Sequence, residues 1–301
     1  MFLRRCRDLG WALGTGVGLL TLVAVWAAWI EPRSLVVRDE VVELEGLRES
    51  LTVLLVGDVQ PAGPHETPAR LDRIMDRLAR TEPDVVVWVG DFVSERRLKT
   101  SFTHPRDTAR AMARIEAPLG HFAVLGNHDW WWDGLGIQRE LEAVGIDVLR
   151  DEHRILPGGL VVAGVEDPVT QRPDLARALR GVAASAPLLL LTHTPDLFPE
   201  VPGHVDLTLA GHTHCGQVSL PFVGRLVVPS RFGQRFAAGW HGTDDHRLRV
   251  TCGIGTAIVP VRLGNPPEAV LLHLRPGSGD ARAATRPPRI PVAPPTGRAQ
   301  G

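Results

Sequence analysis

Residues 210–217 of the 301-residue chain read AGHTHCGQ. His212 and His214 are two positions apart, so in an extended segment their side chains point to the same side, as two ligands of one site must. The stretch directly follows Leu207–Ala210, a short apolar run that is typical of a buried strand. This segment therefore predicts a pair of metal-ligating histidines just past the end of a strand.

Four further segments have the same form, in which an apolar strand candidate is followed at once by a polar residue. They are VGDVQ (56–60), VGDFV (89–93), LGNHD (125–129) and LTHTP (191–195). Amphipathic stretches such as Pro68–Ala79 alternate with these runs, which is the pattern of an α/β domain. A turn aspartate or a core histidine would explain any single segment, but strand ends gather at one sheet edge, where ligands bind. The five segments together predict one metal site built from Asp58, Asp91, Asn127, His193, His212 and His214.

The segments resemble the calcineurin-like metallophosphoesterase superfamily, above all in GNHDWWWDG (126–134) and LAGHTHCGQVSLPFVG (209–224). The resemblance covers about residues 48–275 and is strongest to the membrane-anchored bacterial YaeI/YkuE-like branch. It implies a four-layer α/β/β/α sandwich of two mixed sheets flanked by helices. It also implies two divalent metal ions, Mn, Fe, Zn or Ni, of which we favour Mn.

The ligand sets implied by the resemblance can be carried over residue by residue. One ion would be held by Asp58, Gln60, Asp91 and His214, and the other by Asp91, Asn127, His193 and His212. Asp91 and a hydroxide would then bridge the two ions, and that hydroxide would attack the phosphorus. Gln60 stands where the superfamily usually has histidine, and its neutral amide oxygen is a weaker ligand than imidazole. His65 is a candidate substitute for it, and the alternative is an ordinary solvent-exposed loop residue.

Two residues of the LGNHD segment carry the catalytic expectations. His128 is expected to stabilise the phosphoryl group or to protonate the leaving oxygen, which an imidazole can do near neutral pH. Asp129 is expected to orient His128, and a helix-starting cap is the alternative. The following Trp130–Trp132 are predicted either to pack beneath this loop or to form an apolar rim that contacts an acyl chain or the membrane surface.

The segment Trp11 to Ile30 carries no charge over 20 positions. At 1.5 Å per residue it spans about 30 Å, which matches the hydrocarbon core of a bilayer. Residues 1–30 are therefore predicted to anchor the chain, although a cleaved signal peptide remains the alternative. Arginines precede the segment at positions 4, 5 and 7, which predicts a single-pass protein of the inner (cell) membrane whose catalytic domain is extracytoplasmic.

Charge and composition add expectations about partners, cysteines and the segments that flank the domain. A formal net charge of −1 gives no basic footprint, so no nucleic-acid partner is expected. Three cysteines at positions 6, 215 and 252 match no ligand or framework spacing and are predicted to be free thiols. Residues 31–47 are predicted to form a linker, and the Pro/Arg/Gly-rich residues 276–301 a disordered tail.

These observations predict a binuclear-metal phosphohydrolase that cleaves a phosphodiester or pyrophosphate bond, in a lipid-linked or envelope substrate. One alternative is a membrane-held metal-binding protein of weak activity, with its site degraded at Gln60. Another is a cyclic-nucleotide phosphodiesterase or a nuclease with the same metal core, of which the nuclease is disfavoured by the lack of basic excess.

Overall fold

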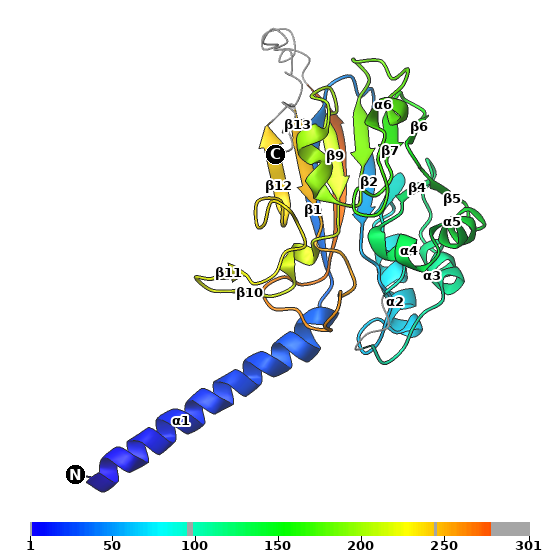
Figure 1. The fold of residues 1–301 in the computed structure, drawn as a ribbon. Coiled ribbons are helices and arrows are strands. Elements are labelled where there is room, and N and C mark those ends of the chain that lie inside the picture. Colours follow the sequence, from blue (N-terminus) through cyan, green and yellow to red (C-terminus); the bar gives the residue numbers. More distant parts are fainter. Residues whose placement is uncertain (1, 95–98, 244–245, 278–301) are drawn as a thin grey trace, which may run out of the picture.

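The computed structural model describes residues 2–94, 99–243 and 246–277, which form two six-stranded mixed sheets with helices around them (Figure 1). The first sheet has the order β1-β14-β2-β3-β4-β5, with bounds Val36–Leu44, Glu268–Pro276, Leu51–Val56, Val85–Val89, His121–Val124 and Ile146–Val148. The second has the order β12-β13-β9-β8-β7-β6, with bounds Gly239–Thr243, His246–Val250, Leu207–Ala210, Leu188–Leu191, Val161–Gly164 and Glu152–Ile155.

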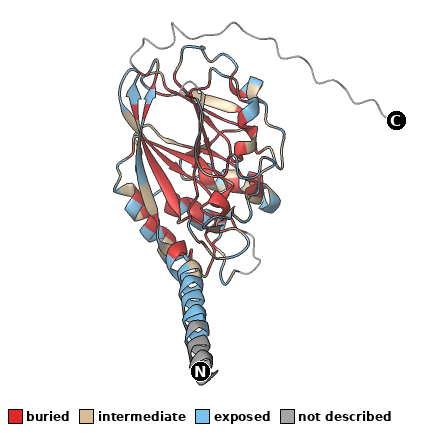
Figure 2. Ribbon diagram, turned by 90° about the vertical axis from the view of Figure 1, so that its left-hand side faces the viewer, coloured by how far each residue is buried: buried red, intermediate tan, exposed pale blue. Residues whose placement is uncertain are grey.

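The two sheets pack face to face because both faces of their central strands are apolar. Along β2, Val53 and Leu55 join the core between the sheets, while Leu54 and Val56 face the helices on the outer side. On the facing sheet, Leu189 and Leu191 of β8 enter the same central core. Figure 2 shows this buried interior running the length of both sheets. Strands buried on both faces read as continuous apolar runs, which is how they were recognisable in the sequence.

Helices complete the four layers that the sequence predicts. The first sheet is covered by α2, α3, α4 and α5, with bounds Pro68–Ala79, Pro105–Met112, Asn127–Trp132 and Gly134–Glu142. The second is covered by the short helix α6 (Leu175–Ala178) and by the 3-10 helix η3 (Pro195–Glu200). This outer layer is thin, because α6 ends at Ala178 and Gly181 beyond it takes a left-handed φ of 83°, which a continued helix would not allow.

The segment predicted as a linker, residues 31–47, contains an ordered strand of the first sheet. Strand β1 pairs in parallel with β14 from Val36↔Glu268 to Leu44↔Pro276. The stretch was unrecognisable as a strand because half-buried edge strands carry charges, here Arg38, which pairs with Glu268. The predicted tail, residues 276–301, lies outside the described residues from 278 onward.

The short apolar run Leu226–Val228 does not form a strand. The structure instead places a small hairpin just before it, formed by β10 (Ser219–Leu220) and β11 (Gly224–Arg225). Leu226 and Val227 are 53% and 72% exposed, so their apolar character does not come from burial in a sheet.

The N-terminal helix projects away from the domain (Figures 1 and 2). It runs through α1 (Phe2–Val25) and a π-helical turn, η1 (Trp26–Ile30). Leu13–Arg33 is long and apolar enough to cross a membrane by length and composition, and none of its most apolar window is buried against the domain. The helix therefore has the form of a membrane anchor, which is also the form of a signal sequence.

Candidate metal centre

The predicted ligands lie at the carboxyl ends of strands from both sheets. Asp58 follows β2, Asp91 follows β3, and Asn127 begins α4 just after β4. His193 follows β8, and the two histidines of the AGHTHCGQ stretch follow β9. Because these strands are parallel within each sheet, their ends meet at one edge and bring all six residues together.

One cluster within this group is formed by Asp58, Asp91 and His214. Each offers a ligand atom, these atoms all lie within 4.8 Å of one another, and all three residues are buried. The His214 Nε2 atom is 3.6 Å from the Asp58 Oδ1 atom. Two buried carboxylates this close repel each other, and a divalent cation between them would remove that repulsion.

A second cluster surrounds the His193 Nε2 atom. It lies 3.0 Å from Asn127 Oδ1, 3.1 Å from His212 Nδ1 and 3.4 Å from Asp91 Oδ2. The other ring nitrogen, Nδ1, is 2.7 Å from the Val89 carbonyl oxygen, to which it donates when protonated. That bond fixes the ring and leaves Nε2 facing the cluster, as a second partner does for metal-ligating histidines.

Gln60 lies beside both clusters. Its Nε2 donates to Asp91 Oδ2 at 2.9 Å, and its Oε1 is buried with no hydrogen-bond partner among the described residues. The ring nitrogen Nδ1 of His214 is likewise buried with no hydrogen-bond partner among the described residues. Buried polar atoms are nearly always satisfied, so an orphaned amide oxygen beside a carboxylate pair fits a cation ligand.

Burial and mutual charge shift the pKa values of these groups. Burial, with the Asp91 charge adding to it, raises the pKa of Asp58 to about 7. Burial would also raise the pKa of Asp91, but His193 and His128 outweigh it and hold that pKa below its usual value. Burial and the neighbouring His193 lower the pKa of His212 to about 4, so its imidazole is neutral near pH 7. A neutral imidazole is the form that binds metal.

The backbone of the ligand loops is held in unusual conformations. Left-handed φ angles occur at 47° for Asp58, 59° for Asp91, 68° for His212, 48° for His214 and 34° for Gln60. Such angles are uncommon outside glycine and gather at functional sites, where surrounding packing enforces them. The clustering of five of them here indicates that the loops are shaped for the site rather than for local stability.

Asp129 occupies the capping position that the sequence left open as the alternative to orienting His128. It is fully buried, and its carboxylate accepts hydrogen bonds from the backbone N–H groups of Asp91, Phe92 and Gly126 at 2.7–2.9 Å. It therefore holds the loop after β3 against the start of α4. Burial and the Asp91 charge raise its pKa to about 8.

His128 lies at the mouth of the site. Its backbone N–H donates to Asp91 Oδ1 at 3.0 Å, and its Nε2 atom is 3.9 Å from Asp91 Oδ2. The side chain retains 15% exposure, so it can meet both a substrate and the ligand cluster. Its ring and the Trp131 ring form an edge-to-face pair, with centroids 5.0 Å apart.

The two alternatives predicted for Trp130–Trp132, packing beneath the loop and an apolar rim, fit different residues of the run. Trp130 packs against the core beneath the loop. Trp131 and Trp132 are 64% and 42% exposed, which fits the apolar rim. His65, the predicted substitute ligand, instead points its Nε2 at the Pro260 carbonyl oxygen, 2.7 Å away. It is buried, contrary to the solvent-exposed alternative.

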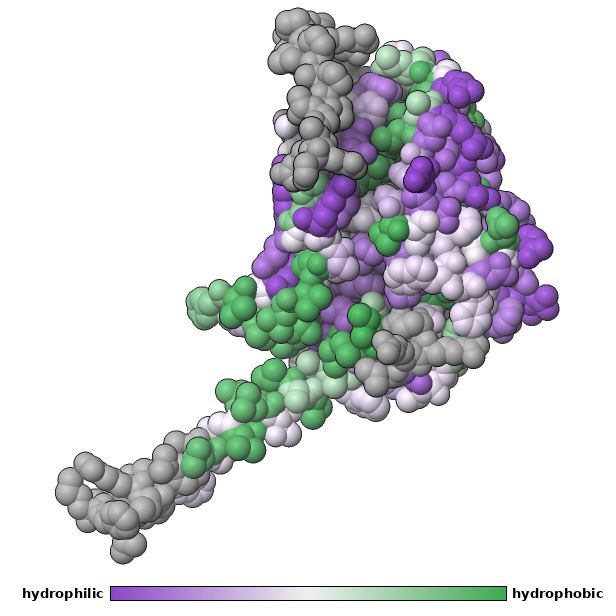
Figure 3. Space-filling model, viewed as in Figure 1, coloured by the Kyte–Doolittle hydropathy of each residue, from purple (hydrophilic) through white to green (hydrophobic). Residues whose placement is uncertain are grey.

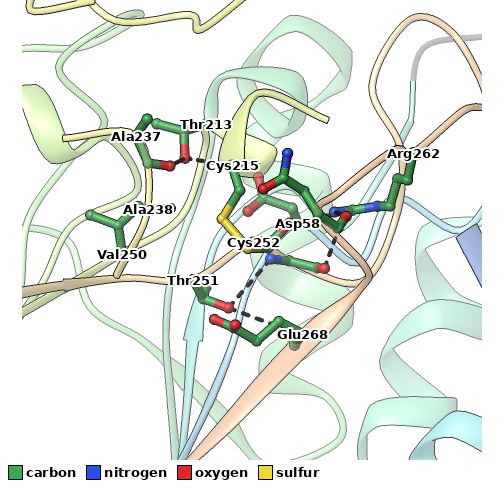
Figure 4. Close-up of a disulfide and its surroundings, with 12 residues drawn as sticks. Asp58, Thr213, Cys215, Ala237, Ala238, Val250, Thr251, Cys252, Arg262 and Glu268 are labelled. Carbon is green, nitrogen blue, oxygen red and sulfur yellow. Dashed lines mark hydrogen bonds between the residues drawn. A yellow bond between two sulfur atoms is a disulfide. The ribbon is translucent and has the colours of Figure 1, made fainter. Parts of the chain in front are cut away.

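The prediction that the cysteines at 215 and 252 are free thiols is wrong, because the two form a disulfide (Figure 4). No spacing motif in the sequence indicates this pairing, whose partners are 37 positions apart. Strands β9 and β13 are parallel neighbours, so the loops that follow them lie side by side. Arg262, also missed, is buried beside the disulfide and donates to the Cys252 carbonyl oxygen at 2.9 Å.

Two mixed sheets with a buried carboxylate and histidine cluster at their strand ends form the kind of site that metal-dependent enzymes use. The model of the calcineurin-like phosphoesterases matches residues 51–216, and the chain belongs to this family. A metallophosphoesterase of Aquifex aeolicus is 32% identical over 72% of this chain and 82% of its own length. The metallophosphoesterase YkuE of Bacillus subtilis is 26% identical over 68% and 72% of the two chains. A transmembrane protein with a metallophosphoesterase domain from Danio rerio is 28% identical over 79% of this chain and 56% of its own length.

The comparisons confirm the predicted family and a metal-dependent phosphoesterase activity. The family and the buried Asp58, Asp91 and His214 cluster together support divalent metal binding. Relatives that are named as transmembrane proteins agree with a membrane role for the N-terminal helix.

Proposed function

We propose that this chain is a membrane-anchored phosphoesterase that uses two divalent ions, preferably Mn²⁺, to cleave a phosphodiester or pyrophosphate bond in a lipid-linked or envelope substrate. The observation that carries the proposal is the buried cluster of Asp58, Asp91 and His214 beside the orphaned oxygen of Gln60. Such a donor set suits a hard or borderline divalent ion.

The two clusters support the two ligand sets that the family resemblance implies. One ion would bind to Asp58, Gln60, Asp91 and His214, and the other to Asp91, Asn127, His193 and His212. Asp91 is the shared member, because one of its oxygens, Oδ2, lies 2.9 Å from Gln60 Nε2 and 3.4 Å from His193 Nε2. When bound, divalent ions polarise phosphoryl oxygens and provide a nucleophilic water near neutral pH.

The protein's own contribution to the reaction would centre on His128. Its imidazole, at the mouth of the cluster, is placed to donate a proton to the leaving oxygen of the substrate. The edge-to-face contact with Trp131 and the backbone bond to Asp91 hold the residue in position. Asp129 would act indirectly, by fixing the start of α4 from which His128 projects.

Replacement of His128 by alanine tests the proposed reaction. We expect the turnover of bis(p-nitrophenyl) phosphate with Mn²⁺ to fall by about 10²–10⁴-fold, the usual contribution of a general acid. The bound metal, measured by plasma mass spectrometry, should not change, because this imidazole is outside both ligand sets. His273→Ala is the matched control, since this histidine pairs with Asp39 at the other end of the sheet. Full metal occupancy without Mn²⁺-dependent turnover in the native chain would favour the metal-binding alternative.

The effect of glutamine at position 60 is tested by Gln60→His. Imidazole binds Mn²⁺, Zn²⁺ and Ni²⁺ better than a neutral amide, so we expect tighter binding of the more weakly held ion. A gain of about 1.4 kcal/mol would appear as a tenfold lower Kd in a metal titration by calorimetry. Unchanged affinity for both ions would show that this side chain is not a ligand.

The location of the catalytic domain is proposed to be extracytoplasmic. The arginines before the apolar segment favour a cytoplasmic N-terminus. The Cys215–Cys252 disulfide adds an independent argument, because disulfides persist in oxidising compartments and are rare in the cytosol. An extracytoplasmic domain disfavours nucleotide-linked substrates of the cytoplasm and favours finished envelope or lipid-linked phosphates.

A further inference from the structure

The β10–β11 hairpin and the loop after Thr256 together expose a group of large apolar side chains. The exposed fraction reaches 110% for Phe222 at the turn and 72% for Val227. Soluble monomers rarely leave such side chains contiguous, and where they do, the patch marks a contact. The group, called here the hairpin surface, consists of Phe222, Val223, Leu226, Val227, Ile258 and Val259.

The local backbone does not account for two of these residues. Phe222 and Ile258 have left-handed φ angles of 67° and 49°. Glycine or asparagine is favoured in this region, and bulky or β-branched residues are outliers there. Their large side chains are therefore neither buried in the domain nor preferred by the turn, which indicates a contact outside the chain.

The loop that carries Ile258 is fastened to the end of the N-terminal helix. The Arg262 backbone N–H donates to the Ala27 carbonyl oxygen at 2.9 Å. The Pro260 carbonyl oxygen lies 2.7 Å from His65 Nε2, and the His65 ring meets the Trp29 ring at 5.9 Å. The loop thus has a fixed position relative to the last turns of the helix.

Those last turns carry the residues expected at a membrane surface. Trp26 and Trp29 are 48% and 53% exposed, and the Arg33 guanidinium stacks 4.1 Å from the Trp29 ring centre. Tryptophan and arginine at the end of an apolar helix mark the interface between lipid and water. Figure 3 shows hydrophobic surface both on the hairpin and along the helix where it meets the domain.

We propose that the hairpin surface inserts into the same bilayer leaflet that the end of α1 enters. The partner is a lipid bilayer because the surface lies at the anchored end of the domain (Figure 1). Its loop is tied to the helix by the Arg262–Ala27 bond and by Pro260, which is bonded to His65 beside Trp29. The domain would then contact the membrane at two points, the helix and the hairpin surface. Two points of contact would fix the orientation of the domain relative to the bilayer.

The segments that carry the hairpin surface are also bonded to the loop that carries His212 and His214. The Gln217 side chain accepts from the Ala257 backbone N–H at 2.6 Å and donates to the Val259 carbonyl oxygen at 3.2 Å. Arg225 of the hairpin donates to the Cys215 carbonyl oxygen at 2.9 Å. The docked domain would therefore hold its site against lipid headgroups. This consequence rests on the proposed function, whereas the docking does not.

The test places an environment-sensitive NBD fluorophore on the full-length chain in phosphatidylcholine–phosphatidylglycerol vesicles. Cys6→Ser removes the remaining thiol, and labelling without reductant spares the disulfide. The test positions are Phe222→Cys and Ile258→Cys. Ile155→Cys is the matched control, because Ile155 is 66% exposed against 61% for Ile258 and pairs with Val161 at the opposite end of the sheet from the site.

We expect the labels at 222 and 258 to shift to shorter wavelength and to lose most of their emission when doxyl-labelled lipids are included. The label at 155 should stay water-like and unquenched. Labels at 222 and 258 that behave like the control would overturn the proposal. A blue shift without quenching by lipid would also overturn it, because protein, such as a second copy of the chain, would then cover the surface. Neither readout depends on hydrolysis, so failure of the proposed activity leaves this test intact.

Discussion

Replacing Asp91 by asparagine should lower the Mn²⁺-dependent hydrolysis of bis(p-nitrophenyl) phosphate by at least about 1000-fold, since loss of one fixed electrostatic contact at such a site already costs about 10²–10³-fold. Asp91 is the member of the site that both clusters share. Its carboxylate contacts Gln60 and lies 3.4 Å from His193 Nε2. Asparagine has the same shape but no charge, so both proposed ions would lose an anionic ligand at once.

Metal content separates this explanation from a folding defect. We expect Asp91→Asn to retain its fold by circular dichroism while the bound metal per chain falls. Asp84→Asn is the matched control, because Asp84 precedes the same strand at its other end and accepts hydrogen bonds from the backbone and hydroxyl of Thr52. Undiminished metal content and activity in Asp91→Asn would show that this carboxylate is not a ligand of the catalytic ions.

The sequence was sufficient to predict that these residues gather at one edge, because their placement follows a rule of sheet geometry. Asp58, Asp91 and His193 each follow a strand buried on both faces, and such strands are recognisable as apolar runs. Parallel pairing then places their ends together without any further information. The motifs and their order along the chain were then sufficient to predict the family.

Features that depend on contacts between distant loops could not be predicted in the same way. Cys215 and Cys252 are paired because β13 lies beside β9, and nothing in either loop alone specifies that neighbour. The role of Asp129 depends on backbone N–H groups that the loop after β3 brings to it. Strand β1 was missed for another reason, since an edge strand with charged residues lacks a continuous apolar run.

The disulfide should contribute the largest single stabilisation outside the core. In the chain-entropy account, a bridge across 37 positions raises the free energy of the unfolded chain by roughly 4 kcal/mol, because it lowers that chain's conformational entropy. It also joins two loops of the candidate site, because Cys215 follows His214 and Cys252 precedes Gly253. A Cβ on Gly253 would lie only 2.5 Å from the Asp58 Cβ atom, so the backbone there packs directly against a proposed ligand.

The Cys215→Ser, Cys252→Ser double variant should therefore unfold about 8–16 °C below the native chain, at roughly 2–4 °C per kcal/mol for a domain of this size. Mn²⁺ affinity should fall as well, because the loops that carry His214 and Asp58 lose their covalent tie. Calorimetry with and without dithiothreitol measures the first effect, and metal titration of the folded variant measures the second.

Cys6→Ser is the control, and it should keep both the native transition and its sensitivity to the reductant. If the thermal transition of the native chain is unchanged by dithiothreitol, and two free thiols titrate at these positions, the bridge does not form. That result would also remove the argument from the disulfide for an extracytoplasmic domain.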